Sequence, residues 1–446
     1  MESTPRRAVG EIKGLPVLGN LLDFKRDRLE LQVRAVETAG ITRLKMLWRT
    51  VWCIGDHDLA QQVLVTDEDS FTKGPILAEV AKPLLGNGLL TAEGEQHRRQ
   101  RKLMAPAFTP KRIAGYGQVM AARAEAARDG LRPHTMIDIA EAMMSTTLDI
   151  VGRTLFDVEL LGDARGIGEA LTDAMTYLVT AGLSFVPSSI PLPSRTRAQR
   201  AVTRLDETVL RVIAERRAAM IRGADDRGDV LSILLEARDE AGALTDRQLR
   251  DEIMVLMLAG HETTANLLAW TWYLLALHPE VRRKLEAELD AVLQGRPPRF
   301  EDLPRLTYTA QVLDEALRLF PPAYTVARTA QRTVQLGGAT VLPGDIALIS
   351  IRAMHRSPRY WDDPLAFRPE RFADRKMRTA PGYLPWGGGP RVCIGNHFAL
   401  VEAALIVATW AQRFRFRLAQ PAPIEPEPLV TLRPRGGVWV EVEPRT

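Results

Sequence analysis

The spacing of apolar residues from about residue 95 to residue 290 is typical of amphipathic helices, and this region covers nearly half of the 446-residue chain. A chain with so much helical pattern must build its core mainly from helices packed on helices. The longest helix is expected from Asp246 to His278, because Thr245 can cap its start and Pro279 ends it. Breaks in the helical pattern are expected at Arg132-Pro133, at Val186 to Pro193 and at Arg222-Gly223.

Strands are predicted only in short stretches outside this helical region. Residues 41–65 alternate in the manner of a short hairpin followed by a helix, and Thr333 to Ile351 have the pattern of short strands joined by turns. An irregular, proline-rich stretch from Pro358 to Pro390 precedes a last helix, expected from Asn396 to about Phe414. The predicted fold class is therefore mainly α with a minor antiparallel β-sheet.

Composition and charge narrow the class of protein. We expect one domain over residues 1–446, beginning with a Pro/Gly-containing segment over residues 1–20, because no repeat or linker divides the chain. The net charge of +4 is too small to indicate nucleic-acid binding. The N-terminus lacks the apolar region of a signal peptide, and the longest apolar run, Ile253 to Ala259, is far shorter than the roughly 18 residues of a spanning helix. We expect a monomeric cytoplasmic protein without a membrane anchor.

The two cysteines, Cys53 and Cys393, stand 340 positions apart, which rules out a disulfide framework, a zinc cluster and a four-thiolate iron–sulfur site. Cys393 lies in a glycine-rich loop, Trp386 to Gly395, that runs into the predicted last helix. Helix amides and the helix dipole favour thiolate over thiol, and glycine lets a flat ligand lie close to the backbone. Cys393 therefore suits an axial ligand of haem iron. The alternative is a buried cysteine in a glycine turn.

This loop resembles the haem-binding signature of the cytochrome P450 family, Phe-x-x-Gly-x-Arg-x-Cys-x-Gly. Gly389, Arg391, Cys393 and Gly395 match it, whereas Trp386 stands where the family usually has Phe. The resemblance implies a single haem domain with haem b (heme b, iron protoporphyrin IX), Cys393 as the iron ligand, and cofactor contacts from Trp386, Arg391 and Gly395. An indole N–H that reached the sulfur would also change the potential of the iron.

A polar interruption in the predicted long helix resembles the oxygen-activation motif of the same family. It spans Ala259 to Thr264, and polar side chains inside an apolar helix cost stability unless they find partners. The resemblance implies that Gly260 opens a groove for O2, Thr263 hydrogen-bonds the bound oxygen or its water, and Glu262 relays protons. The alternative is a solvated kink or a satisfied core threonine.

Two further motifs match the family in the expected order. Glu315 and Arg318 lie three residues apart on one helix face, and Arg371 follows in a Pro-Glu-Arg-Phe segment; the resemblance makes these three a buried structural network that positions the cysteine loop. Basic residues are expected on the haem propionates. These are His97 and Arg101, four residues apart on one predicted helix, together with Arg328, His355 and Arg391.

The resemblance implies a monooxygenase that inserts one oxygen atom of O2 into a C–H bond, by hydroxylation or epoxidation, and reduces the other atom to water. Electrons would come from NAD(P)H through a separate ferredoxin or flavodoxin. Between residues 94 and 113 the only acidic residue is Glu95, whereas six are basic: Arg98, Arg99, Arg101, Lys102, Lys111 and Arg112. This excess of positive charge favours an acidic docking partner over a merely solvated helix face. The alternatives are a peroxide-driven peroxygenase, against which the Glu262-Thr263 pair speaks, and a non-catalytic haem-thiolate binding protein.

The substrate is expected to be apolar, such as a terpenoid, fatty acid, steroid or polyketide. This rests on the apolar character of the segments that would line the pocket by family position, which are Ile76 to Leu90, Tyr177 to Leu192, Leu256 to Ala259, Ala323 to Val326 and Leu429 to Leu432. The Phe185 to Pro193 loop is either a substrate entrance or a packed connector.

Overall fold

The chain visits each of two structural units twice. The computed structural model describes residues 9–74, 81–82, 84–156, 170, 173–174, 177, 193–222, 229–239 and 242–445. One unit combines Met1–Pro75 with Asp314–Cys393, and the other combines Ile76–Leu313 with Ile394–Thr446. The expected single domain over residues 1–446 and the expected monomer stay predictions. The predicted loop from Phe185 to Pro193 lies outside the described residues except for Pro193, which begins helix α9.

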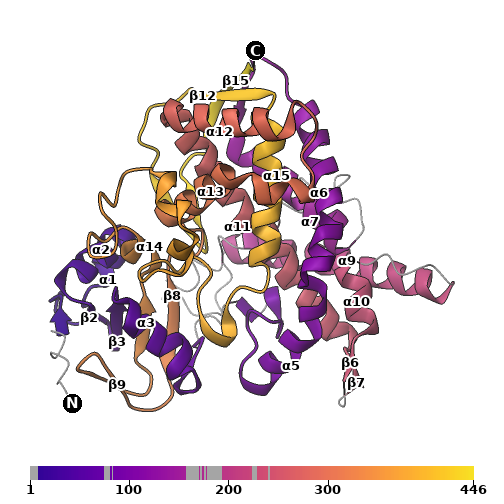
Figure 1. Ribbon diagram of the computed structural model, residues 1–446. Helices are drawn as coiled ribbons and strands as arrows, with labels where there is room; N and C mark the ends of the chain where they lie inside the picture. Colours follow the sequence, from indigo (N-terminus) through magenta and orange to yellow (C-terminus); the bar gives the residue numbers. More distant parts are fainter. Residues whose placement is uncertain are drawn as a thin grey trace. The chain divides into compact units, whose positions relative to one another are not determined.

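The second unit holds the helical body of the protein. Its longest helix, α11 (Asp246–Leu277), packs against α7 (Ile139–Leu155), and α6 (Pro110–Asp129) runs beside α15 (Asn396–Ala411) (Figure 1). The expectation of a mainly helical chain is confirmed. The other helices of this unit are α5 (Gly94–Met104), α9 (Pro193–Ile221), α10 (Val230–Glu236) and α12 (Pro279–Leu293), and α13 (Thr307–Leu319) ends in the first unit.

Helix α11 forms for reasons that are local to its sequence. The Thr245 hydroxyl accepts a hydrogen bond from the Gln248 N–H at 3.3 Å, while the Gln248 side chain accepts one from the Thr245 N–H at 2.9 Å. This capping box satisfies amides that the first turn leaves without partners. The helix ends at His278 because Pro279 cannot supply the next backbone hydrogen bond. Its 32 residues span about 48 Å, and its middle, from Leu249 to Leu275, is almost entirely buried.

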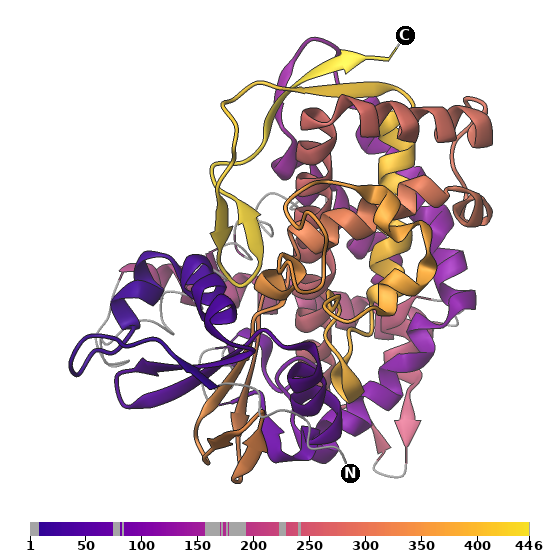
Figure 2. The ribbon, with the colours of Figure 1, turned by 60° about the vertical axis from the view of Figure 1, so that its left-hand side comes forward.

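A six-stranded sheet forms the centre of the first unit. Its order is β1 (Val9–Glu11), β2 (Ile41–Met46), β3 (Arg49–Ile54), β11 (Ile346–Ile349), β8 (Val326–Ala330) and β4 (Phe71–Thr72). The sequence-distant strands β3 and β11 lie side by side, as the indigo and orange arrows of Figure 2 show. Two pairings, β1 with β2 and β3 with β11, are parallel, whereas only antiparallel pairing was expected. The long crossover between β3 and β11 makes a parallel arrangement possible.

Short helices and turns complete the first unit. The helix-forming segments are α1 (Leu21–Arg26), α2 (Arg28–Thr38), α3 (His57–Gln61), α14 (Ile351–His355) and the single turns η1 (Gln62–Thr66), η2 (Glu68–Ser70), η5 (Pro369–Ala373), η6 (Arg375–Thr379) and η7 (Gly389–Arg391). The hairpin β9 (Val334–Leu336) and β10 (Ala339–Val341) closes at Gly337-Gly338, within the stretch where short strands joined by turns were predicted. Cys53, on β3, is fully buried among aliphatic side chains such as Leu31 and Leu44.

Small sheets flank the helices of the second unit. One pairs β5 (Met136–Asp138) with β15 (Trp439–Pro444), which also pairs with β12 (Phe414–Leu418). Two hairpins, β6 (Arg238–Asp239) with β7 (Gly242–Ala243) and β13 (Pro426–Pro428) with β14 (Leu432–Pro434), are antiparallel. Within the residues described, no helix combines the length and the apolar character needed to cross a membrane.

Candidate functional site

The cysteine loop exposes its thiol. Cys393 is exposed, and its backbone N–H donates a hydrogen bond to the Trp386 carbonyl at 3.0 Å. The Val392 N–H donates to the Gly389 carbonyl at the same distance, which closes the turn η7 just before the cysteine. The loop is therefore held by its own backbone, and the half-buried Trp386 contributes its carbonyl to that framework.

Glycine is required at one position of this loop. Gly389 has a φ of +66°, and a Cβ atom there would stand 2.0 Å from the Leu64 carbonyl oxygen. A side chain would therefore be strained in its backbone conformation and would collide with backbone atoms of η1. This explains why the glycine run lies before Cys393 and why the loop can pass so close to another segment.

The two cysteines have opposite environments. Burial raises the pKa of Cys53 to about 12, so this thiol stays protonated and inert. Nowhere in the described chain do three His, Cys, Asp or Glu side chains gather as a metal site. A metal at Cys393 must therefore bring its remaining ligands with it, as the iron of a porphyrin does. An exposed thiol in a loop of glycines fits haem, whose porphyrin supplies the other iron ligands.

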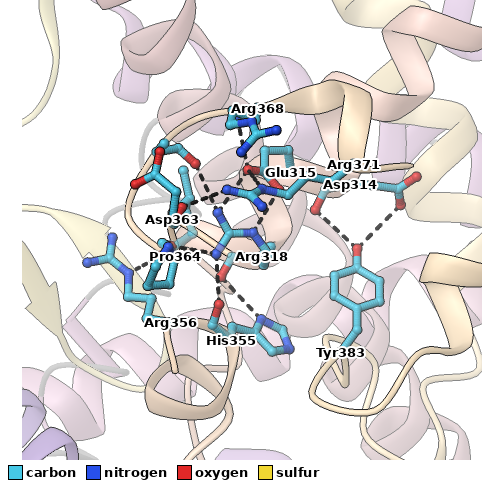
Figure 3. A network of polar contacts seen from close by, with 12 residues as sticks. Asp314, Glu315, Arg318, His355, Arg356, Asp363, Pro364, Arg368, Arg371 and Tyr383 are labelled. Atoms are coloured by element: carbon cyan, nitrogen blue, oxygen red, sulfur yellow. Dashed lines mark hydrogen bonds and ion pairs between the residues drawn. The ribbon is translucent and has the colours of Figure 1, made fainter. Parts of the chain in front are cut away.

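A fully buried ion pair holds the segment before the cysteine loop (Figure 3). Arg318 and Glu315 have no exposed side-chain surface, and they pair through Nε–Oε2 at 2.7 Å and Nη2–Oε1 at 2.8 Å. The Arg371 Nε adds a contact to Glu315 Oε1 at 3.3 Å, and the Arg368 backbone N–H donates to the same oxygen at 3.0 Å. The expected buried network of Glu315, Arg318 and Arg371 is confirmed.

Arg318 also binds the backbone of the irregular stretch that follows. It donates to the carbonyls of His355 at 2.8 Å, Pro364 at 2.7 Å and Ala366 at 3.0 Å. Its guanidinium lies over the Trp361 ring, 5.0 Å from the centroid. One buried cation thus joins helix α13 to a region with little regular secondary structure. Its hydrogen bonds satisfy backbone carbonyls that have no partner in a helix or sheet.

His355 belongs to this framework. Its Nε2 accepts a hydrogen bond from the Leu384 N–H at 2.8 Å, and its Nδ1 donates to the Arg318 carbonyl at 3.2 Å. Burial and the Arg318 charge lower the pKa of His355 to about 3, so the ring is neutral. Both ring nitrogens are bonded to backbone, and no donor is left for a haem propionate. We therefore assign His355 to the support of the loop, in place of the propionate role expected from sequence.

Three residues of the segment Ala259 to Thr264 form an accessible stripe in the middle of α11. From Leu249 to Leu275 every residue is buried except Ala259, Gly260 and Thr263, which lie at i, i+1 and i+4 on one side of the helix. A Cβ atom at Gly260 would come within 3.1 Å of a Val151 methyl group, so even alanine is tight there. The Thr263 hydroxyl donates to the Ala259 carbonyl at 2.6 Å. A flat ligand or O2 could approach α11 along this stripe.

Glu262 is buried beside the stripe and has specific partners. Its Oε1 accepts hydrogen bonds from Arg433 Nε at 2.9 Å, from Arg433 Nη2 at 2.8 Å and from the Thr431 hydroxyl. Arg433 was not predicted as a site residue, and Thr431 was expected only as part of the pocket-lining segment Leu429 to Leu432, without a role toward Glu262. They follow Glu262 by about 170 positions, so no local pattern relates them to it.

The other predicted cofactor contacts are found in both units. In the second unit, α5 carries His97 buried and Arg101 half-buried on one face, and a Cβ atom at Gly395 would lie 3.9 Å from the Phe108 ring. In the first unit, Arg328 is half-buried on β8, and Arg391 pairs with Glu68 at 3.0 Å with its side chain 7% exposed. The roles of these residues at a propionate stay predictions.

Sequence reasoning missed a buried carboxyl group on α15. Glu402 is fully buried, and neither of its oxygens has a hydrogen-bond partner in the described structure. Burial raises its pKa well above the ordinary value, and the nearby Thr264 hydroxyl offsets this only in part. The signal was available, because Glu402 is the only acidic or basic residue among the aliphatic and aromatic residues of this helix apart from His397.

Comparison with known proteins agrees with this geometry. The cytochrome P450 family model matches residues 10–440, and the chain belongs to this family. The chain is a cytochrome P450 monooxygenase, and haem is the cofactor of the family.

Several relatives match almost end to end. The chain is 38% identical to cyclooctatin synthase of Streptomyces melanosporofaciens over 439 residues, which cover 97% of this chain and 95% of that protein. It is 36% identical to cyclooctat-9-en-7-ol 5-monooxygenase of the same organism, with coverages of 90% and 88%. It is 32% identical to pentalenene oxygenase of Streptomyces avermitilis, with coverages of 94% and 93%.

The buried network predicts a large loss on removing its cation. Arg318→Leu leaves the Glu315 carboxylate buried without its main partner, so we expect the free energy of unfolding to fall by about 3–5 kcal/mol and haem content to drop. Arg368→Leu is the matched control, because that side chain is exposed and only its backbone N–H joins the network. Urea unfolding and haem content per chain measure both variants. Equal behaviour of the two would show that the buried cation is not what supports the loop.

Glu402 predicts a pH-dependent gain in stability on neutralisation. Because the folded protein holds the Glu402 proton above the ordinary carboxyl pKa, the wild-type stability falls as pH rises above about 4.3, by up to about 1.4 kcal/mol per pH unit until the folded pKa is reached. Glu402→Gln lacks this loss, so its advantage over wild type should grow between pH 5 and pH 8. Urea midpoints of the haem-loaded proteins test this, and parallel pH profiles would contradict it.

Proposed function

We propose that this monooxygenase binds the iron of haem b through Cys393 and inserts one oxygen atom of O2 into a C–H bond of a terpenoid-class substrate. The observation that carries the proposal is the accessible stripe of Ala259, Gly260 and Thr263 in the otherwise buried middle of α11 (Leu249 to Leu275), next to the buried acid Glu262. A helix core that is accessible only at Ala259, Gly260 and the Thr263 alcohol, with an acid beside them, is suited to receive O2 and deliver protons to it.

Haem, when bound, supplies the redox chemistry by which O2 is reduced and cleaved. The residues of the chain bind, orient and supply protons. Cys393 would hold the iron, and the Arg318 network keeps its loop in place. Thr263 would present its hydroxyl to oxygen, and Glu262 would carry protons to the same place. His97, Arg101, Arg328 and Arg391 would bind the propionates, with Trp386 and Gly395 beside the ring.

The substrate class rests on the relatives and on the residues beside the motif. Leu256, Met257 and Leu258 of α11 are buried and apolar, and so is Leu432 on β14. Relatives named for cyclooctat-9-en-7-ol and pentalenene match this chain over nine-tenths of its length or more. Both names denote largely hydrocarbon molecules with few polar groups. A hydrophobic terpenoid skeleton is the substrate that such surroundings can hold without unpaired polar atoms.

Electrons would arrive from NAD(P)H through a separate ferredoxin or flavodoxin. Arg98 on α5, Lys102 at its end and Lys111 on α6 are exposed. Phe108, between these helices, contacts the Phe398 ring of α15 edge-on at 6.5 Å and lies beside Gly395, two residues after Cys393. The exposed cations therefore flank the start of the helix that follows the cysteine loop, which is suitable for an acidic electron donor.

The iron ligand predicts a spectroscopic difference between the two cysteines. The reduced carbon-monoxide complex of the wild type should show the red shift characteristic of a thiolate ligand, and Cys393→Ala should lose it. Cys53→Ala is the matched control and should keep the red shift, because the Cys53 thiol is buried in a hydrophobic cluster. A terpenoid that shifts the haem spin state should then give hydroxylated product with a ferredoxin system. Turnover with hydrogen peroxide alone would indicate a peroxygenase, and a spin shift without product would indicate a binding protein.

The docking surface predicts a salt-dependent defect. Reversing Arg98 and Lys111 to Glu should slow reduction by an acidic ferredoxin about tenfold at low salt, and high salt should narrow the difference. Reversing Arg211 and Arg283, which are exposed on α9 and α12, changes the net charge equally and serves as the control. Stopped-flow reduction kinetics measure both pairs. A ferredoxin that reduces both double variants at the same rate docks elsewhere.

A further inference from the structure

Three residues one helical turn apart attach helix α11 to the strand β14. Glu262, Asn266 and Trp270 stand at i, i+4 and i+8, so they lie in a row on one face. The Trp270 indole N–H donates to the Leu432 carbonyl at 2.9 Å, and the Asn266 amide donates to the Thr431 hydroxyl oxygen at 3.0 Å. Together with the Arg433 contact, this row fixes the register between strand and helix.

The direction of these hydrogen bonds is determined by their chemistry. Because Thr431 Oγ1 accepts from the Asn266 amide, its own proton is available for Glu262 Oε1. Arg433 can only donate, and both of its contacts end on the same oxygen. Three donors therefore converge on Oε1, and a proton could bind there only by displacing one of them.

The second carboxyl oxygen of Glu262, Oε2, has different surroundings from Oε1. Among the described residues, none donates a hydrogen bond to Oε2. The Glu262 side chain is 2% exposed and the Arg433 side chain 15%, so the pair is largely shielded from water and its geometry is not averaged by solvent. The carboxyl group is thus oriented with one oxygen held and one oxygen available.

We propose that Arg433 and Thr431 are positioning residues for proton delivery: they hold Glu262 by Oε1 so that Oε2 is the atom that gains and loses protons. This inference rests on the proposed function, in which Glu262 relays protons during turnover. Productive turnover consumes C–H, O2, two electrons and two protons and yields C–OH and water. If protons arrive in the wrong place, O2 takes up two electrons and two protons and leaves as hydrogen peroxide, and the substrate is unchanged.

The test compares two arginines of the same hairpin. Arg433→Met removes the fork that holds Oε1, whereas Arg435→Met alters an exposed arginine that pairs with Glu425 at 3.1 Å and does not contact Glu262. In the haem-loaded enzyme with its electron donors, Arg433→Met should lower product formed per NAD(P)H by on the order of tenfold and raise hydrogen peroxide correspondingly. Its substrate affinity, read from the spin-state shift, and its carbon-monoxide spectrum should be unchanged.

Conservative variants separate positioning from a structural role. Arg433→Lys, which keeps the charge without the fork, should restore coupling in part, and Thr431→Ser should behave as wild type while Thr431→Val does not. The solvent isotope effect on product formation should increase in Arg433→Met and stay unchanged in Arg435→Met. Equal coupling in Arg433→Met and Arg435→Met would overturn the positioning role.

Glu262→Gln, run in parallel, distinguishes this inference from the function on which it rests. If Glu262→Gln couples normally, the proton role in the proposed function fails. If Glu262→Gln uncouples and Arg433→Met does not, only the positioning role fails. A double-mutant cycle of these two changes in urea unfolding adds a readout that is independent of turnover. Non-additive losses are expected, and additive losses would contradict the contact.

Discussion

The structure of the first unit depends on one buried guanidinium. All five N–H donors of Arg318 are used, two on Glu315 and three on backbone carbonyls of the segment from His355 to Ala366. A buried charge is tolerable only when its hydrogen-bonding capacity is met in this way. The arrangement gives a largely irregular stretch a fixed path, and His355 extends it by receiving the Leu384 N–H, two residues before Trp386. The cysteine loop begins where this framework ends.

In the second unit, helix α11 is held mainly by the packing of buried side chains. Between Leu249 and Leu275 it is buried almost all round, so most of these residues serve packing, and the exceptions in this stretch are Ala259, Gly260 and Thr263. The acid next to them is not left to solvent. It is bound by a strand that α11 itself positions through Asn266 and Trp270. Some residues of α11 thus leave part of its surface accessible, while Asn266 and Trp270 hold the segment that orients Glu262.

Two of the buried glutamates of the second unit, Glu262 and Glu402, show how the surroundings of a carboxyl group decide its role. Glu262 receives three donors on one oxygen, which defines its orientation. Glu402 receives none within the described structure, and burial keeps it in the protonated form over a wider pH range. The same side chain is therefore an oriented acid in one place and a neutral core group in another. Only the neighbours differ.

The sequence by itself determined the mainly helical fold, the bounds of α11, the cysteine loop, the Glu315–Arg318–Arg371 network and the oxygen-activation motif. The helices, the cysteine loop and the Glu315–Arg318 pair depend on residues close together, and helix caps and glycine turns act over a few residues. Arg371 lies 56 positions after Glu315, and it was included in the network only because of the family resemblance. The tertiary structure alone decided the parallel pairing of β3 with β11, the backbone partners of His355, the isolation of Glu402 and the binding of Glu262 by Arg433. These contacts join segments separated by tens to hundreds of positions, and their energies come from burial and orientation that exist only once the chain has folded.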